Sequence, residues 1–97
     1  MIRHIALFRL KEDAPKEAKA SLEEGLFLLA QTISEIERYE YGADLGLREG
    51  NYDFAVVADF ADAAAFRIYA EHPDHKAFIA DRLTPVAAER ASLQFEL

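Results

Sequence analysis

The residues in this sequence best suited to acid–base chemistry are gathered in one short segment, Tyr69-Ala70-Glu71-His72-Pro73-Asp74-His75. A histidine moves a proton near neutral pH, and a tyrosine hydroxyl donates to an oxygen that gains negative charge. The proline forces a turn that could bring Tyr69 and His75 toward one point. Both residues also have an interpretation without a chemical role. Tyr69 could be a core residue beside Phe66, and His75 could be a solvated residue in the first turn of a helix.

The two remaining histidines are open to similar alternatives. His72 precedes a proline at an expected helix end, where the helix dipole favours a cationic cap. His4 lies on an otherwise apolar strand face. It is either a core histidine whose polar atoms are satisfied by a hydrogen bond, or a polar group placed inside a pocket. Ser92 and Gln94 share one face of the last expected strand. They would lie near His4 if that strand paired with the first.

Metal and cofactor chemistry have little support in the sequence. His72 and His75 have a spacing that binds metal on a helix, but Pro73 interrupts the helix and only Glu71 and Asp74 are near enough to serve as further ligands. We therefore expect neither a metal nor a cofactor. The chain has no cysteine, which excludes disulfides, thiolate nucleophiles and cysteine-ligated zinc. It also lacks a phosphate-binding glycine loop and the common hydrolase and metalloprotease motifs.

The hydrophobic pattern predicts the elements that would position these residues. A first helix starts at Asp13 or Ala14, with Pro15 in its first turn, and a shorter one is capped by Asp62 and ends near His72. Asp74 caps a further turn or two. Strands are expected over residues 1–10, 36–41, 52–60 and 90–97. The first helix carries an apolar stripe, interrupted by Gly25, where we expect a close approach to the sheet or to a ligand; the stripe comprises Ala18, Leu22, Leu26, Leu29 and Ile33.

The order of these elements is β-α-β-β-α-(α)-β, which predicts an α+β, ferredoxin-like antiparallel sheet with helices on one face. Residues 1–97 are expected to form a single domain, because the chain is short and no linker divides it. The opposite sheet face is too apolar to leave in water; it carries Ile5, Leu7, Ala55 and Val57. Two such sheets packed face to face would cover it, so we expect a homodimer in the form of a dimeric α+β barrel.

The net charge of the chain disfavours two classes of binding partner. Eleven Lys and Arg residues against eighteen Asp and Glu give a formal net charge of −7. This disfavours nucleic acid, whose phosphates require basic residues, and it also disfavours an anionic membrane surface. The first ten residues are too short and too charged for a signal peptide or a membrane span. A cytoplasmic location is therefore expected.

Three segments resemble the stress-responsive A/B barrel family, called Dabb. They are the opening Ile2-Arg3-His4-Ile5-Ala6-Leu7-Phe8-Arg9-Leu10-Lys11, the middle Gly50-Asn51-Tyr52-Asp53-Phe54-Ala55-Val56-Val57-Ala58-Asp59-Phe60, and Tyr69-x-x-His72-Pro73-x-His75. Phe95 near the end matches as well. The resemblance covers essentially the whole chain, and it implies the same dimeric α+β barrel.

The resemblance also implies a candidate chemistry. The family's best-understood enzymes are plant polyketide cyclases of the olivetolic acid cyclase type, which carry out an intramolecular aldol condensation without a cofactor. Their catalytic tyrosine and histidine match Tyr69 and His75, and further histidines match His4 and His72. A histidine on their third strand is replaced here by Phe54. The aromatic residues that line their first helix are replaced by Leu22, Glu23 and Leu26, so the substrate is not carried over.

Three functions follow. The favoured one is a homodimer that binds a small apolar or aromatic molecule in a pocket between sheet and helices, lined by Phe8, Leu26, Val56 and Phe78, with His72 beside it. The second is a cofactor-free cyclase or lyase with His4, Tyr69 and His75 as catalytic residues. The third is a non-catalytic stress or assembly protein. A haem-degrading monooxygenase is disfavoured, because such enzymes of this barrel type use a tryptophan and the chain has none.

Overall fold

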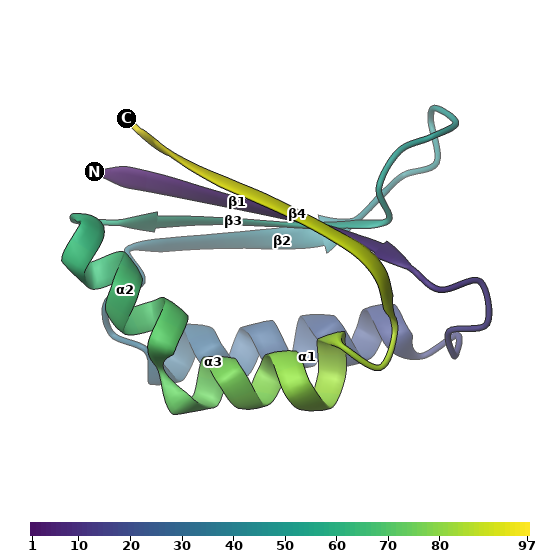
Figure 1. The fold of residues 1–97 in the computed structure, drawn as a ribbon, viewed down its shortest axis with the longest axis horizontal. Helices are drawn as coiled ribbons and strands as arrows, with labels where there is room; N and C mark the ends of the chain where they lie inside the picture. Colours follow the sequence, from purple (N-terminus) through teal and green to yellow (C-terminus); the bar gives the residue numbers. More distant parts are fainter.

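The computed structural model describes residues 1–97, which form one four-stranded sheet and a layer of helices (Figure 1). In chain order the elements are β1 (Ile2–Leu10), α1 (Ala18–Thr32), β2 (Arg38–Ala43), β3 (Phe54–Phe60), α2 (Ala63–Glu71), α3 (Pro73–Phe78), the π-helical turn η1 (Ile79–Leu83) and β4 (Ala87–Glu96). None of the helices is both long and apolar enough for a membrane span.

The sheet has the strand order β2-β3-β1-β4, and every neighbouring pair is antiparallel. All the helices lie on one side of it, and the two chain ends lie near each other at one end of the neighbouring strands β1 and β4 (Figure 1). This is the ferredoxin-like arrangement that the sequence predicts. The two central strands are β1 and β3, which are the two strands whose sequences are apolar on both faces.

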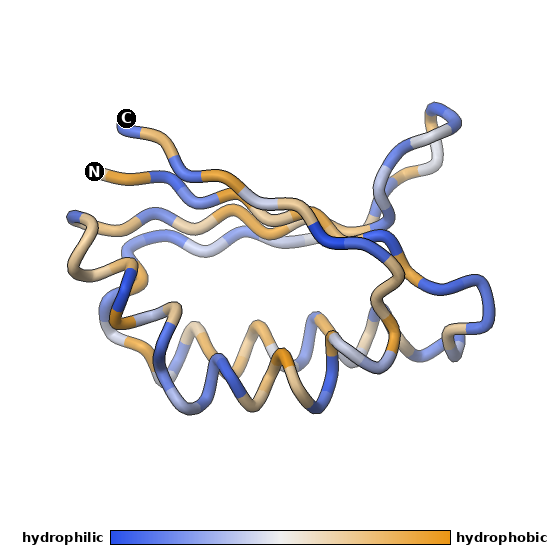
Figure 2. The backbone as a smooth tube through the Cα atoms, in the orientation of Figure 1, coloured by the Kyte–Doolittle hydropathy of each residue, from blue (hydrophilic) through white to orange (hydrophobic).

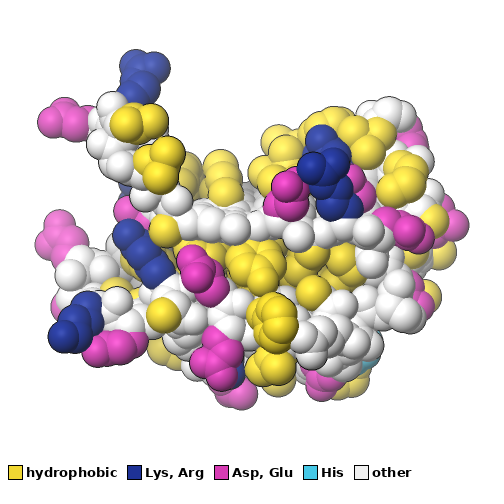
Figure 3. Space-filling model, turned by 180° about the vertical axis from the view of Figure 1, so that it is seen from behind, with side chains coloured by type: hydrophobic (Ala, Val, Ile, Leu, Met, Phe, Trp, Pro, Cys, Tyr) yellow, Lys and Arg dark blue, Asp and Glu magenta, His cyan; other side chains and the backbone are white.

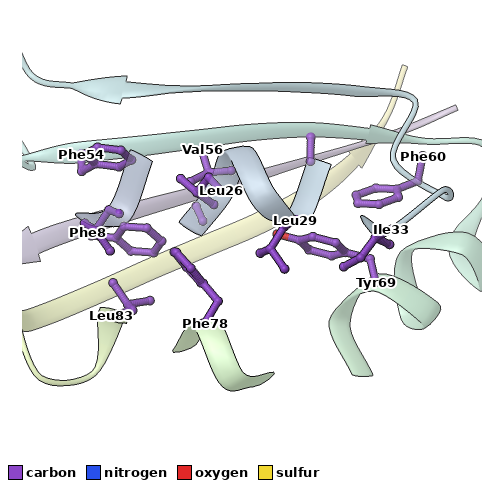
Figure 4. Close-up of a cluster of buried hydrophobic side chains, with 13 residues drawn as sticks. Phe8, Leu26, Leu29, Ile33, Phe54, Val56, Phe60, Tyr69, Phe78 and Leu83 are labelled. Atoms are coloured by element: carbon purple, nitrogen blue, oxygen red, sulfur yellow. The ribbon is translucent and has the colours of Figure 1, made fainter. Parts of the chain in front are cut away.

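The hydrophobic core fills the space between the sheet and the helices (Figure 4). Alternate residues of β1 and β3 supply one side, among them Phe8, Phe54 and Phe60. The predicted stripe of α1 supplies much of the other, since Leu22, Leu26 and the remaining members of the stripe are all buried. The alternating strand pattern and the helical stripe are therefore both confirmed.

The opposite face of the sheet is uncovered. Ile5, Leu7 and Val57 are only half-buried there, and the β4 side chains of Leu93 and Phe95 are 56% and 44% exposed. Hydrophobic side chains are visible above the sheet, next to the loop between β2 and β3, which projects from the same side (Figures 1 and 3). The predicted bare apolar face is thus present in the folded chain.

Several element boundaries differ from those the sequence predicts. Helix α1 begins at Ala18 instead of Asp13 or Ala14, because a residue that precedes a proline is disfavoured in helical conformation. Two turns fill the gap, closed by hydrogen bonds from the Ala14 nitrogen to the Lys11 carbonyl oxygen and from the Ala18 nitrogen to the Pro15 carbonyl oxygen. Strands β2 and β3 begin two residues later than predicted, and β4 begins three residues earlier. Hydropathy along the backbone shows the polar turns between these elements (Figure 2).

Gly25 marks a close approach, but to a neighbouring helical segment instead of the sheet. A Cβ atom at this position would lie 2.6 Å from Phe78 Cδ1 and 2.7 Å from Arg82 Cδ. The glycine therefore lets α1 pack directly against the segment formed by α3 and η1. This contact fixes the position of Phe78, whose ring points up toward the sheet (Figure 4).

Candidate functional site

A cavity of about 400 Å³ lies between β1, β4 and the segment formed by α3 and η1. Nine of the thirteen residues that line it are hydrophobic, and its volume is within the range of small-molecule sites. The predicted pocket residues Phe8, Leu26, Val56 and Phe78 all line it, as do His4, Tyr69 and His75. The remaining lining residues are Ala6, Ile79, Leu83, Arg90, Ala91 and Ser92.

Tyr69 and His75 are brought together by the turn at Pro73. Tyr69 is on the buried face of α2, and its ring reaches into the layer between helices and sheet (Figure 4). His75 is in the first turn of α3, which begins at Pro73. The two ring centroids are 4.2 Å apart with a tilt of 35°. The convergence predicted from the sequence is therefore present.

The hydrogen bond of His75 fixes which of its nitrogens can accept a proton. His75 Nδ1 lies 3.2 Å from the Ala70 carbonyl oxygen. A carbonyl oxygen can only accept, so Nδ1 carries the hydrogen and Nε2 carries the lone pair. Burial lowers the pKa of His75, and the charge of His72 adds to this, whereas the bond to Ala70 raises it. The net direction favours a neutral imidazole with Nε2 free to act as a base.

His4 has the opposite tautomer. Its partner across the β1–β4 ladder is Gln94, whose side-chain nitrogen donates to His4 Nδ1 at 2.9 Å. Nε2 of His4 therefore carries the hydrogen and is a donor. Burial lowers the pKa of His4 to about 4, with a smaller effect of His75 in the same direction. The ring centroid of His4 is 6.1 Å from that of Tyr69.

Tyr39 is a residue that the sequence analysis missed. Its hydroxyl oxygen lies 2.7 Å from that of Tyr69. Burial raises the pKa of Tyr69 to about 12, and the bond to Tyr39 acts in the opposite direction. Burial raises the pKa of Tyr39 far above its ordinary value, and the bond to Tyr69 raises it further. Either hydroxyl can donate in this bond, and when Tyr39 donates, the hydroxyl hydrogen of Tyr69 is free for a ligand.

His72 was predicted from the sequence to be a binding residue beside the pocket. In the structure it is not among the residues that line the cavity. It ends α2 and precedes α3, and its Nδ1 accepts a hydrogen bond from the Asp74 nitrogen at 3.1 Å. His72, and not Asp74, is thus the N-terminal cap of α3, with Pro73 in the first helical position. This is the reverse of a cationic C-terminal cap, because Nδ1 must be unprotonated to accept. No three carboxylate or imidazole side chains converge in a metal-binding arrangement.

Comparison with known proteins gives a consistent picture. The family model described as "Stress responsive A/B Barrel Domain" matches residues 2–97. An uncharacterized protein of Streptomyces coelicolor is 33% identical over 82 residues, which are 82% of this chain and 84% of that protein. A dimeric ferredoxin-like protein of unknown function from Thermobifida fusca is 46% identical, with a TM-score of 0.91 over 99% of this chain and 90% of that one. The hydroxynitrile lyase of Passiflora edulis shares the fold at 21% identity, with a TM-score of 0.85 over 99% of this chain and 92% of that one.

Proposed function

Because the chain belongs to the stress-responsive A/B barrel family, we propose that it is a homodimer that binds a small, largely apolar molecule in the cavity between sheet and helices. The dimer is supported by the bare apolar sheet face and by the dimeric neighbour from Thermobifida fusca. The binding function is carried by one observation, a 400 Å³ apolar cavity on which the hydrogen-bonding groups of His4, Tyr69 and His75 converge.

The test is a calorimetric titration of the protein with a panel of small aromatic and aliphatic ketones, alcohols and acids. At least one compound should bind with one site per protomer. Ser92→Phe would obstruct the cavity from the exposed strand β4, so it should abolish this binding. The matched control is Ala20→Phe on the exposed side of α1, which should leave binding unchanged. A panel without a binder, or binding that survives Ser92→Phe, would overturn the proposal.

A second candidate function is cofactor-free acid–base catalysis on a carbonyl compound. It is favoured by the complementary tautomers of the site: Nε2 of His75 can accept a proton, while the Tyr69 hydroxyl and His4 Nε2 can donate hydrogen bonds. In the proposed step His75 removes a proton from the carbon next to a carbonyl group. The electrons of the C–H bond form a C=C bond, and the π electrons of the carbonyl group move to its oxygen, which Tyr69 stabilises as an enolate. Return of the proton from His75 to carbon completes the exchange. The hydroxynitrile lyase among the structural neighbours shares the fold alone.

The second candidate function is tested by proton NMR, which measures how fast the α-protons of a panel ketone that binds are exchanged for deuterium in D₂O. General acid–base catalysis is typically worth about a hundredfold or more. We expect the wild-type protein to exchange the α-protons about a hundredfold faster than His75→Ala, with Tyr69→Phe in between. Equal exchange by all three proteins would favour the third function, that of a non-catalytic stress or assembly protein. In that case substitution of these residues would change stability alone.

A further inference from the structure

We infer that the ligand of the cavity is a monocarboxylate and that Arg90 binds its carboxylate group at the mouth of the cavity, an inference that rests on the proposed binding function. The cavity has apolar walls at Phe8, Phe78 and Leu83, and Arg90 lines the same space from β4. A molecule that satisfies both features has an apolar body and one negative charge.

The charged side chains that line the cavity favour a ligand with a single negative group. No aspartate, glutamate or lysine is among its lining residues, and Arg90 is the one permanently charged side chain there. The two lining histidines have lowered pKa values, because burial disfavours their charged forms. The cavity of a chain with a formal charge of −7 thus carries a local charge of about +1 near neutral pH.

Arg90 has no partner of its own within the protein. The arginines at positions 3, 9, 38 and 82 each form an ion pair with a carboxylate of the chain. Arg90 takes part in none of these pairs. Arg48 and Arg67 are also outside them, but neither lines the cavity. Arg90 is therefore the arginine that combines a free guanidinium group with access to the proposed ligand, and a guanidinium group matches a carboxylate through two parallel hydrogen bonds.

The register of the sheet places Arg90 at one end of the cavity and the acid–base groups at the other. Arg90 pairs with Phe8, Ser92 with Ala6, and Gln94 with His4. These three β4 residues share the face toward the helices, and a strand rises about 3.3 Å per residue, so Arg90 and Gln94 are about 13 Å apart at their Cα atoms. In Figure 4, Phe8 and Leu83 lie toward one end of the apolar cluster and Tyr69 toward the other.

This spacing defines the class of ligand more closely. The arginine side chain extends several ångströms from its Cα atom, so the carboxylate and the group near Tyr69 are separated by a few carbon atoms or one aromatic ring. The exposed hydroxyl of Ser92 lies between them on the same strand face and can give the carboxylate a second donor. A keto acid with an apolar linker would place its carboxylate at Arg90 and its ketone at Tyr69 and His75.

The experiment compares three probes that share one phenylethyl body: 3-phenylpropanoate, its isosteric amide 3-phenylpropanamide, and the uncharged 3-phenylpropan-1-ol. Each is titrated into wild type, Arg90→Gln, Arg90→Lys and Arg67→Gln. Arg67 is an exposed and unpaired arginine on α2, so Arg67→Gln changes the net charge by the same amount as Arg90→Gln at a place outside the cavity. Melting temperatures establish that all variants are folded.

We expect wild type to bind the carboxylate about fivefold more tightly than the amide or the alcohol, a modest preference because Arg90 is exposed to water. Arg90→Gln should remove the preference, Arg90→Lys should keep part of it, and Arg67→Gln should leave it intact. Equal binding of all probes, or a preference that survives Arg90→Gln, would overturn the role of Arg90 and leave the binding cavity standing. Failure of every probe to bind wild type, while a compound of the wider panel does bind, would overturn the carboxylate ligand alone; failure of the probes and of the whole panel would overturn the binding function as well.

Discussion

Substitution of Gly25 by alanine tests how the cavity wall is held in place. Alanine has the highest helix propensity, so in an unconstrained helix the change should stabilise the protein by about 1 kcal/mol. Here the added Cβ would lie 2.6 and 2.8 Å from two ring carbons of Phe78 and 2.7 Å from Arg82 Cδ. The ring of Phe78 is buried in the core, whereas the long side chain of Arg82 can move more readily.

The two effects oppose each other, and their magnitudes decide the sign. Overpacking a filled core typically costs about 1–3 kcal/mol, which exceeds the gain in helix propensity. We therefore expect Gly25→Ala to lose about 1 kcal/mol, a decrease in melting temperature of roughly 4–8 °C for a chain of this size. The displaced Phe78 ring would also enter the cavity that it lines, so the variant should bind the panel ligand more weakly.

The assay is thermal unfolding followed by circular dichroism at one fixed protein concentration. Ala20→Gly, at an exposed position of the same helix, measures the propensity effect without a clash and should lose up to about 1 kcal/mol. In a Phe78→Leu background the cost of Gly25→Ala should shrink, because the clashing ring is gone. A melting temperature that rises in Gly25→Ala, or a cost unchanged by Phe78→Leu, would show that the Phe78 ring does not resist the added Cβ.

Three further predictions concern the site and the open sheet face. Because the pKa of His4 is about 4 in the folded chain against 6.5 ordinarily, the stability that its neutral form provides is complete above about pH 6.5 and is lost progressively as the pH falls from 6.5 to about 4. Urea unfolding at pH 7 and pH 4.5 should therefore show that His4→Asn loses about 1 kcal/mol less stability than wild type between the two pH values, a figure discounted for partial exposure, and equal losses would contradict this expectation. Tyr39→Phe removes the 2.7 Å bond to the Tyr69 hydroxyl and should cost about 1 kcal/mol in the same assay, while the control Tyr41→Phe should cost nearly nothing; similar costs for both would count against the hydroxyl pair. Leu93→Glu places a charge on the exposed apolar sheet face and should convert the dimer to monomer in light scattering, and an unchanged dimer would exclude this face as the interface.

Much of the fold could be predicted from patterns within single elements. The alternation of β3 and the four-four-three-four spacing of the α1 stripe each specify a buried face locally, and the structure confirms both. The predicted ends of the helices and strands were less accurate, because these ends depend on the turns that flank them. The turn at Pro15, for example, delays the start of α1. The partner of Gly25 required knowledge of how α1 packs against α3, which no local pattern contains.

The site was predictable where the sequence itself brings residues together. Tyr69 and His75 are six residues apart across a proline, so their approach follows from the local chain. The contact of His4 with Gln94 depended on the register of two strands from opposite ends of the chain, and so did the position of Arg90 beside Phe8. Tyr39 was missed for the same reason: its hydroxyl meets Tyr69 only after β2 has taken its place at the edge of the sheet.

The protein is proposed to be a homodimer in which each protomer holds a small molecule in the cavity between its sheet and its helices. Native mass spectrometry of the purified protein, followed by a run under denaturing conditions, measures the oligomeric state and any retained ligand together. We expect a dimer with a reproducible additional mass, present as purified or after incubation with a panel binder, that is released on denaturation. A monomer would exclude the homodimer, and a dimer that holds no small molecule under either condition would exclude the binding function.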